Sequence, residues 1–381
     1  MLPGVTPTRK LRLFMTADAV GGIWQYALEL AQGLVDHGVE TTLAVLGPTT
    51  DAAQVAAAGA VHGLKLLQTE LPLDWTAATP DEVKKAGASL AAFADESGPD
   101  IIHLNSAALA AGARFPAPVV VACHSCVTTW WDAVREGPVP EDFLWRAKLV
   151  QQGYRAADAL IAPTGAFATV TRRTYGLPKA PQVVYNGRSI AAHRPDRPAL
   201  CASFAFTAGR LWDEGKNLAA LDRAAGRLSV PVVAAGPLDG PNGAHIEFKH
   251  LKTVGRLGDG DIAGWLKAAP IFVSPARYEP FGLAVLEAAQ AGCPLVLSDI
   301  PSFRELWDGA AIFVPPDDDR AIATAIEQTI MDAKLRETLE QAARERALDY
   351  SAEAMAAGVF DIYRSLLSTA NRQASREEAV A

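Results

Sequence analysis

The chain has few cysteines and no regular cysteine spacing. Its four cysteines include one C-x2-C pair, Cys123 and Cys126, but a structural zinc site needs a second pair of ligands and none lies within reach. This pattern argues against a disulfide-stapled fold and suits a reducing compartment. We therefore expect no metal site.

The sequence also lacks long apolar runs and a surplus of basic residues. No run of about 18 apolar residues occurs and the start has no secretory-type apolar segment, so we expect a cytoplasmic protein with at most peripheral membrane contact. The formal net charge of −8 argues against a nucleic-acid partner, which would require a basic face.

Strand-like runs alternate with helical stretches along most of the 381 residues, of which 50% are hydrophobic and 20% charged. That composition is ample for two buried cores. The runs of the first half are Leu11–Thr16, Thr41–Leu46, Leu64–Gln68, Ile101–Asn105, Val119–Cys123, Leu160–Ala162 and Val183–Tyr185. The alternation predicts a parallel, doubly wound sheet of the α/β class.

The same pattern begins again after the middle of the chain, which predicts a second α/β domain. Its runs are Phe204–Thr207, Val232–Ala235, Leu251–Val254 and Ile271–Ser274, with helices expected from Lys216 and near 260–269. An Asn-Gly pair and prolines interrupt regular structure at 186–198. We therefore predict an N-terminal domain at 1–190, a C-terminal domain at 191–351 and a flexible polar tail at 371–381.

Residues 271–298 read as a βαβ unit: an apolar strand, a loop with Pro and Gly, a helical pattern and a second strand. Glu279 stands in the loop and Glu287 on the helix. Their eight-position separation, at about 1.5 Å per helical residue, is roughly 12 Å. That is too far for two carboxylates flanking one scissile bond, so they are not an acid–base pair of the glycosidase type.

The start of this helix is a predicted anion site. Phe281, Gly282 and Leu283 open the helix, where backbone N–H groups lack intrahelical partners and the helix dipole is positive. The order along the chain is therefore carboxylate, anion site, carboxylate. A nucleotide-sugar has the matching order of sugar hydroxyls, diphosphate and ribose diol, and carboxylates accept hydrogen bonds from hydroxyls.

Further candidates follow other strands, because open parallel sheets bind ligands at the carboxyl ends of their strands. Gly21 and Gly22 form either a tight connection or a place where bare backbone approaches a ligand. They are not the G-x-G-x-x-G fingerprint of a nicotinamide dehydrogenase. His124 is either a structural histidine or a ligand contact. Arg210 and Lys216 are either solvated surface charges or cations that neutralise a diphosphate leaving group in place of a metal ion.

Aromatic residues gather after His124. Trp130, Trp131, Phe143, Trp145 and Tyr154 are candidates either for the core or for a sugar-stacking acceptor surface, because flat apolar rings suit pyranose faces.

Two motifs carry a family resemblance. Glu-Pro-Phe-Gly-Leu-(x)3-Glu-Ala at 279–288, followed by Gly-Cys-Pro-Leu-Val, resembles the E-x7-E signature of retaining glycosyltransferases with the GT-B fold, in particular glycosyltransferase family four. Gly-Arg-Leu…Lys-Asn at 209–217 is similar to a second motif of that family, and Gly21-Gly22 looks like its N-terminal glycine loop. The resemblance covers about residues 11–367.

The resemblance implies a GT-B fold, with two Rossmann-like doubly wound domains facing a central cleft and a last helix at 352–369 that rejoins the first domain. It implies retaining, metal-independent transfer of a sugar without a cofactor. The donor would be a nucleoside-diphosphate sugar, with UDP-sugar expected first and GDP-sugar second. The acceptor would be a hydroxyl of a saccharide, a glycolipid or a small molecule.

The resemblance also implies roles for the candidate residues. Arg210, Lys216 and the N–H groups of 281–283 would hold the diphosphate. Glu279 and His124 would contact the donor sugar, while Glu287 would hold the ribose. The remaining donor-site residues would be Gly21, Gly22 and the nucleobase loop residues Arg256 and Leu257.

Two rival functions stay open at this point. A non-hydrolysing UDP-sugar epimerase would share the two-domain shape, but it needs no acceptor. A non-catalytic sugar-nucleotide binder would keep Glu287 but would not need Arg210, Lys216, Glu279 and His124 together.

Overall fold

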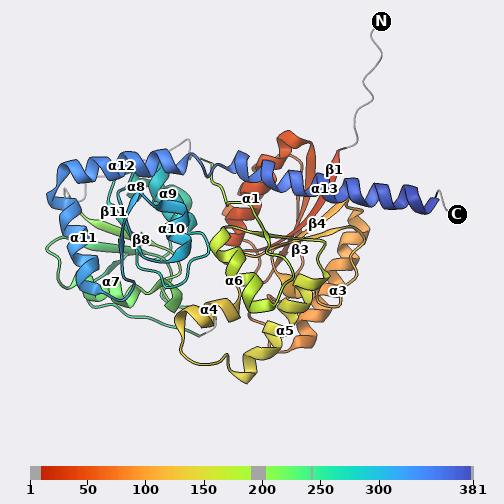
Figure 1. Ribbon diagram of the computed structural model, residues 1–381, viewed down its shortest axis with the longest axis horizontal. Helices are drawn as coiled ribbons and strands as arrows, with labels where there is room; N and C mark the ends of the chain where they lie inside the picture. The colour runs from red at the N-terminus through yellow and green to blue at the C-terminus, as the bar shows by residue number, and fades with distance from the viewer. Residues whose placement is uncertain (1–9, 190–202, 242, 379–381) are drawn as a thin grey trace, which may run out of the picture. The chain divides into compact units, whose positions relative to one another are not determined.

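The computed structural model describes residues 10–189, 203–241 and 243–378 (Figure 1). Its two sheets have the strand orders β3-β2-β1-β4-β5-β6-β7 and β10-β9-β8-β11-β12-β13. Each order grows outward in two directions, from β1 and β4 in the first sheet and from β8 and β11 in the second, and the registered pairs are parallel. This confirms the predicted α/β class with two Rossmann-like, doubly wound sheets.

The elements of the first half follow the predicted strands closely. The strands are β1 (Leu11–Asp18), β2 (Val39–Leu46), β3 (Leu64–Gln68), β4 (Ile101–Leu104), β5 (Val119–Ala122), β6 (Ala159–Ala162) and β7 (Gln182–Val183). The helices are α1 (Gly22–Leu34), α2 (Ala52–Ala60), α3 (Pro80–Ser97), α4 (Val127–Val134), α5 (Glu141–Ala156) and α6 (Gly165–Tyr175), with short 3-10 turns η1 (Val35–His37) and η2 (Ala107–Ala110).

The second half repeats the pattern. Its strands are β8 (Ala205–Ala208), β9 (Val232–Ala235), β10 (Lys252–Thr253), β11 (Ile271–Ser274), β12 (Leu295–Ser298) and β13 (Ala311–Val314). Its helices are α7 (Leu218–Ala225), α8 (Asp259–Lys267), α9 (Leu283–Ala291), α10 (Pro301–Trp307), α11 (Asp319–Met331), α12 (Ala333–Ala347) and α13 (Ala352–Glu378), with the 3-10 turn η3 (Glu214–Lys216).

The second sheet separates two cores because alternate residues of a strand face opposite sides. Phe206 and Phe272 belong to one buried cluster, which includes residues of α8, α9, α10 and α12. Ala205 and Ile271 belong to the other, with residues of α7 and α11. The helices on both faces leave the carboxyl ends of the strands to loops, and those loops carry most of the candidate residues.

Packing divides the described chain into two compact units that do not follow the predicted boundary at 190/191. One unit contains residues up to 124, then 144–161 and those from 355 onward; the other contains 125–143 and 162–354. Helix α6 groups with the second unit because Glu305 accepts hydrogen bonds from the first two backbone N–H groups of that helix, each at 2.7 Å. Strand β7 at 182–183 still belongs to the first sheet, so the boundary at 190/191 stays a prediction. Part of the expected joint, 190–198, lies outside the described residues.

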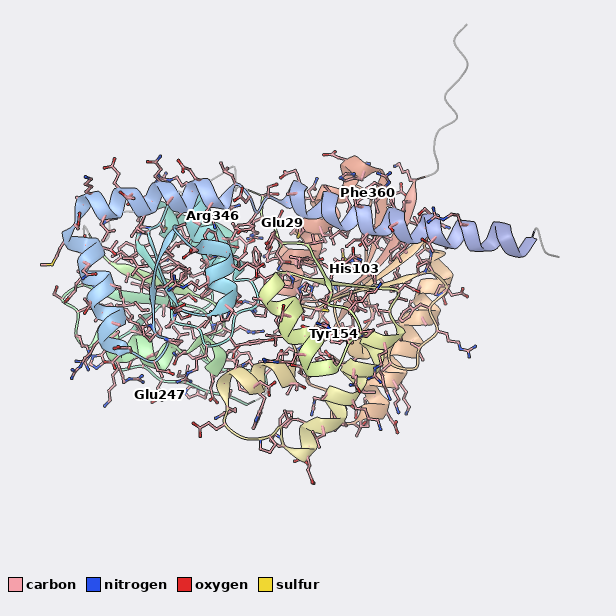
Figure 2. All side chains as sticks on the ribbon, in the orientation of Figure 1. Glu29, His103, Tyr154, Glu247, Arg346 and Phe360 are labelled. Carbon is pink, nitrogen blue, oxygen red and sulfur yellow. The ribbon has the colours of Figure 1, made fainter. Side chains whose placement is uncertain are left out.

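The long helix α13 groups with the first unit. Tyr363 on α13 is fully buried, and its hydroxyl lies 2.6 Å from Nδ1 of His103 on β4. Phe360, which is labelled in Figure 2, lies on the same helix. Its ring centroid is 4.5 Å from that of His37. The helix continues through Glu378, so residues 371–378 are helical where we predicted a tail. No helix in the described part of the chain is both long and apolar enough to span a membrane.

Candidate active site

The loop after β8 presents two cations. Arg210 follows β8 directly, and Lys216 ends the turn η3. The helix that we expected from Lys216 begins only at Leu218, because Asn217 adopts a left-handed conformation with φ 56°. Its amide donates to the carbonyl oxygens of Pro275 at 3.0 Å and Pro316 at 2.7 Å, which holds the loop against the carboxyl end of β11.

Asp213 organises this loop. Its carboxylate accepts hydrogen bonds from Arg210 Nη2 at 2.8 Å, from the Trp130 indole Nε1 at 2.9 Å and from the Gly215 backbone N–H at 2.9 Å. Burial raises the pKa of this carboxyl, but Arg210, Lys216 and the hydrogen bonds outweigh burial, so the pKa lies below its usual value. Asp213 is therefore a buried anion that fixes the orientation of Arg210.

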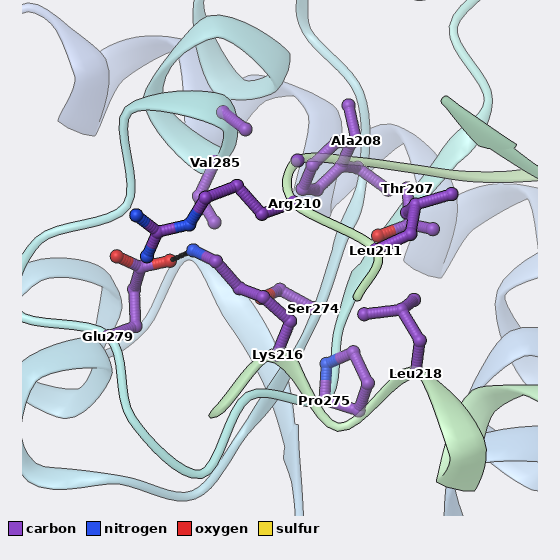
Figure 3. Close-up of a pocket in the computed structure, with 13 residues that line it drawn as sticks. Thr207, Ala208, Arg210, Leu211, Lys216, Leu218, Ser274, Pro275, Glu279 and Val285 are labelled. Carbon is purple, nitrogen blue, oxygen red and sulfur yellow. Dashed lines mark hydrogen bonds and ion pairs between the residues drawn. The ribbon is translucent and has the colours of Figure 1, made fainter. Parts of the chain in front are cut away.

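Lys216 forms an ion pair with Glu279, the first glutamate of the E-x7-E motif. Only 22% of the lysine side chain and 14% of the glutamate side chain are exposed. Figure 3 shows the two groups converging with the Arg210 guanidinium in a pocket that Thr207, Ser274, Ala284 and Val285 also line. The pocket lies where β8 and β11 end, the topological switch point at which doubly wound sheets bind ligands.

The start of α9 lies at the same pocket. Gly282 caps the helix with φ 95°, and a Cβ there would meet Phe303 at 3.1 Å and Glu279 at 3.3 Å. The first helical bonds run from Val285 and Leu286 to the Gly282 carbonyl, so the N–H groups of the preceding residues face away from the helix ladder. Phe281 is buried and anchors the turn. The geometry fits an anion site at the N-terminus of α9.

Glu287 lies one to two turns further along α9 and pairs with Arg188, at 2.8 Å between Oε1 and Nη2. It does not line the pocket around Lys216, so the two glutamates occupy separate positions, as their spacing predicted. The loop with Arg256 and Leu257 connects β10 to α8, and Leu257 packs against the hydrophobic core. Arg256 has no described contact with the other candidate residues.

The first unit places the glycine pair at the start of α1. Gly21 is the N-cap of that helix, and Gly22 is its first residue. Asp18, at the end of β1, accepts hydrogen bonds from Val20 N at 3.0 Å and Gly21 N at 3.3 Å. The turn is thus a tight connection that ends in an exposed helix start at Gly22, and an approach to a ligand there stays a prediction.

His124 follows β5 and packs edge-on against Tyr26 of α1, with 4.5 Å between ring centroids. The Asn105 amide donates to the Thr16 carbonyl, so its Oδ1 is the acceptor that faces His124 Nε2 at 2.7 Å. The histidine therefore donates from Nε2 and presents Nδ1 as an acceptor. Burial lowers the pKa of His124 to about 4, so the ring is neutral at pH 7.

The aromatic residues after His124 do not form one exposed surface. Tyr154 is buried, Phe143 is exposed, and the three tryptophans are partly buried. Trp130 and Trp131 lie on α4, within reach of the Arg135 guanidinium at 5.9 and 6.0 Å from their ring centroids. No group of three or more His, Cys, Asp or Glu in the described ranges is placed to hold a metal ion.

Two family models match the chain along most of its length. Glycosyltransferase Family 4 matches residues 20–191, and Glycosyl transferases group 1 matches residues 244–346. The second match includes both glutamates of the E-x7-E motif. The chain belongs to glycosyltransferase family four.

Relatives of known name align with this glycosyltransferase over more than four fifths of their length. A D-inositol 3-phosphate glycosyltransferase of Nocardioides sp. is 26% identical over 404 residues, which cover 92% of this chain and 86% of the relative. One of the same name from Streptomyces bingchenggensis is 27% identical, covering 91% and 85%. The chain is thus a glycosyltransferase of the kind that acts in glycan or glycolipid synthesis.

Solved structures share its fold. Sucrose-phosphate synthase of Thermosynechococcus elongatus superposes with a TM-score of 0.77 at 18% identity, covering 94% of this chain and all of that one. HepE of Anabaena in complex with UDP-glucose has a TM-score of 0.71 at 19% identity, covering 93% and all of that chain. The fold of this glycosyltransferase is GT-B.

Three residues of this glycosyltransferase's site were not found from its sequence: Asp213, Arg188 and Asn105. Asp213 stands inside the Gly-Arg-Leu…Lys-Asn motif, and a carboxylate between two candidate cations is a signal that could have revealed it. Arg188 stands in the segment that we read as a linker. Asn105 ends a predicted strand, but its partner His124 lies 19 positions away, so only the sheet order brings them together.

Proposed function

We propose that this glycosyltransferase transfers a sugar from a nucleoside-diphosphate donor to a hydroxyl acceptor with retention at the anomeric carbon and without a metal ion. The single observation that carries the proposal is the convergence of Arg210, Lys216 and Glu279 beside the N-terminus of α9. The donor is a UDP-sugar or, second, a GDP-sugar. The UDP-glucose complex of the structural relative HepE favours the first.

The proposed chemistry uses charge rather than a covalent intermediate. As the bond between the anomeric carbon and the diphosphate oxygen breaks, negative charge grows on the leaving group. Arg210, Lys216 and the helix dipole of α9 stabilise that charge. The acceptor oxygen bonds to the same face of the sugar, and its proton passes to the departing diphosphate oxygen.

Carboxylates and His124 complete the proposed assignments. Glu279 addresses the sugar, on which positive charge develops, and the neutral His124 accepts a hydrogen bond from a sugar hydroxyl through Nδ1. Glu287 binds the ribose. For a diphosphate to bind Lys216, the ammonium must exchange part of its pairing with Glu279, which frees the carboxylate for sugar hydroxyls.

A direct test measures nucleoside diphosphate release from UDP-glucose, UDP-N-acetylglucosamine and GDP-mannose with a panel of saccharide, polyol and lipid acceptors. Proton NMR of the product then gives the anomeric configuration, which must match that of the donor. Incubating each donor alone tests the epimerase alternative, because an epimerase converts the sugar without an acceptor. Inverted product, or epimerised donor, would contradict the proposal.

A further inference from the structure

Arg188 is an almost buried arginine beside the proposed ribose ligand. Its Nη2 lies 2.8 Å from Glu287 Oε1 and 3.6 Å from Asp259 Oδ2, and 11% of its side chain is exposed. Taking a guanidinium out of water is costly unless partner charges offset the loss of hydration. Glu287 supplies that charge at close range, so the two side chains form one unit.

The backbone holds this arginine in place. A Cβ at Gly187 would meet the Ser351 carbonyl oxygen at 2.0 Å, so only glycine allows the chain to pass this close. The Arg188 N–H donates to the Tyr350 carbonyl at 3.2 Å. Its own carbonyl accepts from the side chain of Gln290 at 2.9 Å, and Gln290 lies three positions after Glu287 on α9. The guanidinium is therefore fixed relative to the same helix that carries the carboxylate.

A ribose diol can form hydrogen bonds with both a carboxylate and a guanidinium. Each hydroxyl of a ribose diol is a donor and an acceptor, whereas an ionised carboxylate only accepts and a guanidinium only donates. A lone Glu287 would also repel a diphosphate anion, which a neighbouring cation offsets. We propose that Arg188 and Glu287 bind the ribose of the donor together. Glu287 accepts a hydrogen bond from one ribose hydroxyl, and Arg188 donates a hydrogen bond to the oxygen of the adjacent ribose hydroxyl. This rests on the proposed nucleoside-diphosphate donor.

Calorimetry with UDP and GDP tests the assignment without any acceptor. The nucleotide that binds wild type more tightly is compared with its 2′-deoxy and 3′-deoxy analogues, in wild type, Arg188→Gln and Arg188→Lys. Because a charge-assisted hydrogen bond is lost, Arg188→Gln weakens the ribonucleotide roughly 10- to 150-fold. The same substitution weakens binding of one deoxy analogue far less, namely the analogue that lacks the hydroxyl contacted by Arg188. The preference of the protein for the ribonucleotide over that analogue is therefore largely lost. Arg188→Lys keeps a donor and retains part of the discrimination.

A matched control comes from a second arginine–glutamate pair of the same unit. Arg336 lies 3.0 Å from Glu340, is 25% exposed, and donates to the Ala269 carbonyl at 2.7 Å. Arg336→Gln loses a comparable ion pair outside the residues assigned to the donor, so its nucleotide affinities stay at the wild-type level. Thermal unfolding of each variant identifies any that fails to fold, and Arg188→Lys then carries the test.

Three results would overturn the proposal. Equal weakening of ribonucleotide and both deoxy analogues by Arg188→Gln means that Arg188 only supports the helix. Tighter nucleotide binding by Arg188→Gln means that the arginine competes with ribose for Glu287. Wild type that binds neither UDP nor GDP overturns the proposed donor and this assignment with it, whereas the first two results leave the donor standing.

Discussion

Asp213 Oδ2 lies 2.8 Å from Arg210 Nη2, and only 8% of the Asp213 side chain is exposed against 44% of the Arg210 side chain. The buried partner therefore orients the exposed one. Because the same carboxylate also accepts the Trp130 indole N–H and the Gly215 N–H, it joins α4 to the turn that ends in Lys216.

We expect Asp213→Asn to lower kcat/KM roughly 10- to 150-fold, because a charge-assisted hydrogen bond to Arg210 becomes a neutral one or is lost. The Asn side chain keeps the size of Asp, so folding is spared. Trp130→Phe is the matched control, since it removes one donor to Asp213 but leaves the carboxylate and its Arg210 pair intact, so it should lower kcat/KM much less than Asp213→Asn does. If the Asp213→Asn variant keeps the kcat/KM of wild type, Arg210 does not need Asp213 to orient it.

Substitutions of the two glutamates of the E-x7-E motif should have different effects on nucleotide binding and turnover. Glu287→Ala should weaken binding of free nucleoside diphosphate and of intact donor alike, roughly 10- to 150-fold, because both carry the ribose diol. Glu279→Ala should leave nucleoside diphosphate binding nearly intact and lower turnover, because only interactions that strengthen in the transition state change that rate.

Calorimetry with nucleoside diphosphate, beside steady-state kinetics of both variants, separates these effects. The two variants also differ in the cation that loses its partner, because Glu279 pairs with Lys216 whereas Glu287 pairs with Arg188. Equal losses of nucleotide affinity in both variants would mean that the carboxylates serve one spot or merely support the loop.

The sequence predicted the regular parts of this molecule and the residues that its motifs name. Strands such as Leu64–Gln68 and Ile271–Ser274 were predicted at their observed bounds, because short runs rich in apolar residues between turn residues have few alternatives. Gly282 was predicted to open α9 and adopts the left-handed conformation that glycine tolerates. Local chemistry was enough at these places.

What the sequence did not predict depends on partners far along the chain. The bond from Trp130 to Asp213 joins positions 83 apart, and Arg188 is a candidate site residue only because α9 brings Glu287 to it across 99 positions. The grouping of α6 with the second unit was not predicted either, since Glu305 binds the N-terminus of α6 from 140 positions away. Spacing in one sequence carries no signal for such pairs.

Turnover should be independent of divalent metal ions. The proposed neutralising charges are the Arg210 and Lys216 side chains, aided by the dipole of α9, so excess EDTA should leave the rate of nucleoside diphosphate release unchanged. Lys216→Met should then reduce that rate strongly, and added Mg²⁺ or Mn²⁺ should not restore it. Loss of activity in chelator that one metal restores would refute the role given to these cations.

Two histidines of the first unit should make the protein less stable in mild acid. Burial lowers the pKa of His103 to about 3, with the nearby His124 as a second cause, and it lowers that of His124 to about 4. In the unfolded chain both groups titrate near pH 6.5. Between about pH 6.5 and 4 the unfolded chain therefore binds more protons than the folded one, so stability rises with pH in this window and falls as the solution is acidified.

The size of the effect follows from the same linkage. Each histidine should remove about 2 kcal/mol from the free energy of unfolding between pH 7 and pH 5, where folded-state carboxylates still contribute little. Urea unfolding at pH 7, 6 and 5 measures it. His124→Gln keeps a hydrogen-bond donor for Asn105. It should remove the part of the acid-induced loss in unfolding free energy that His124 causes. The exposed His245, whose pKa Asp239 raises, acts in the opposite direction, so His245→Gln should steepen the loss slightly. A free energy of unfolding that is equal at pH 7 and pH 5 in wild type would mean that neither ring is held neutral by the fold.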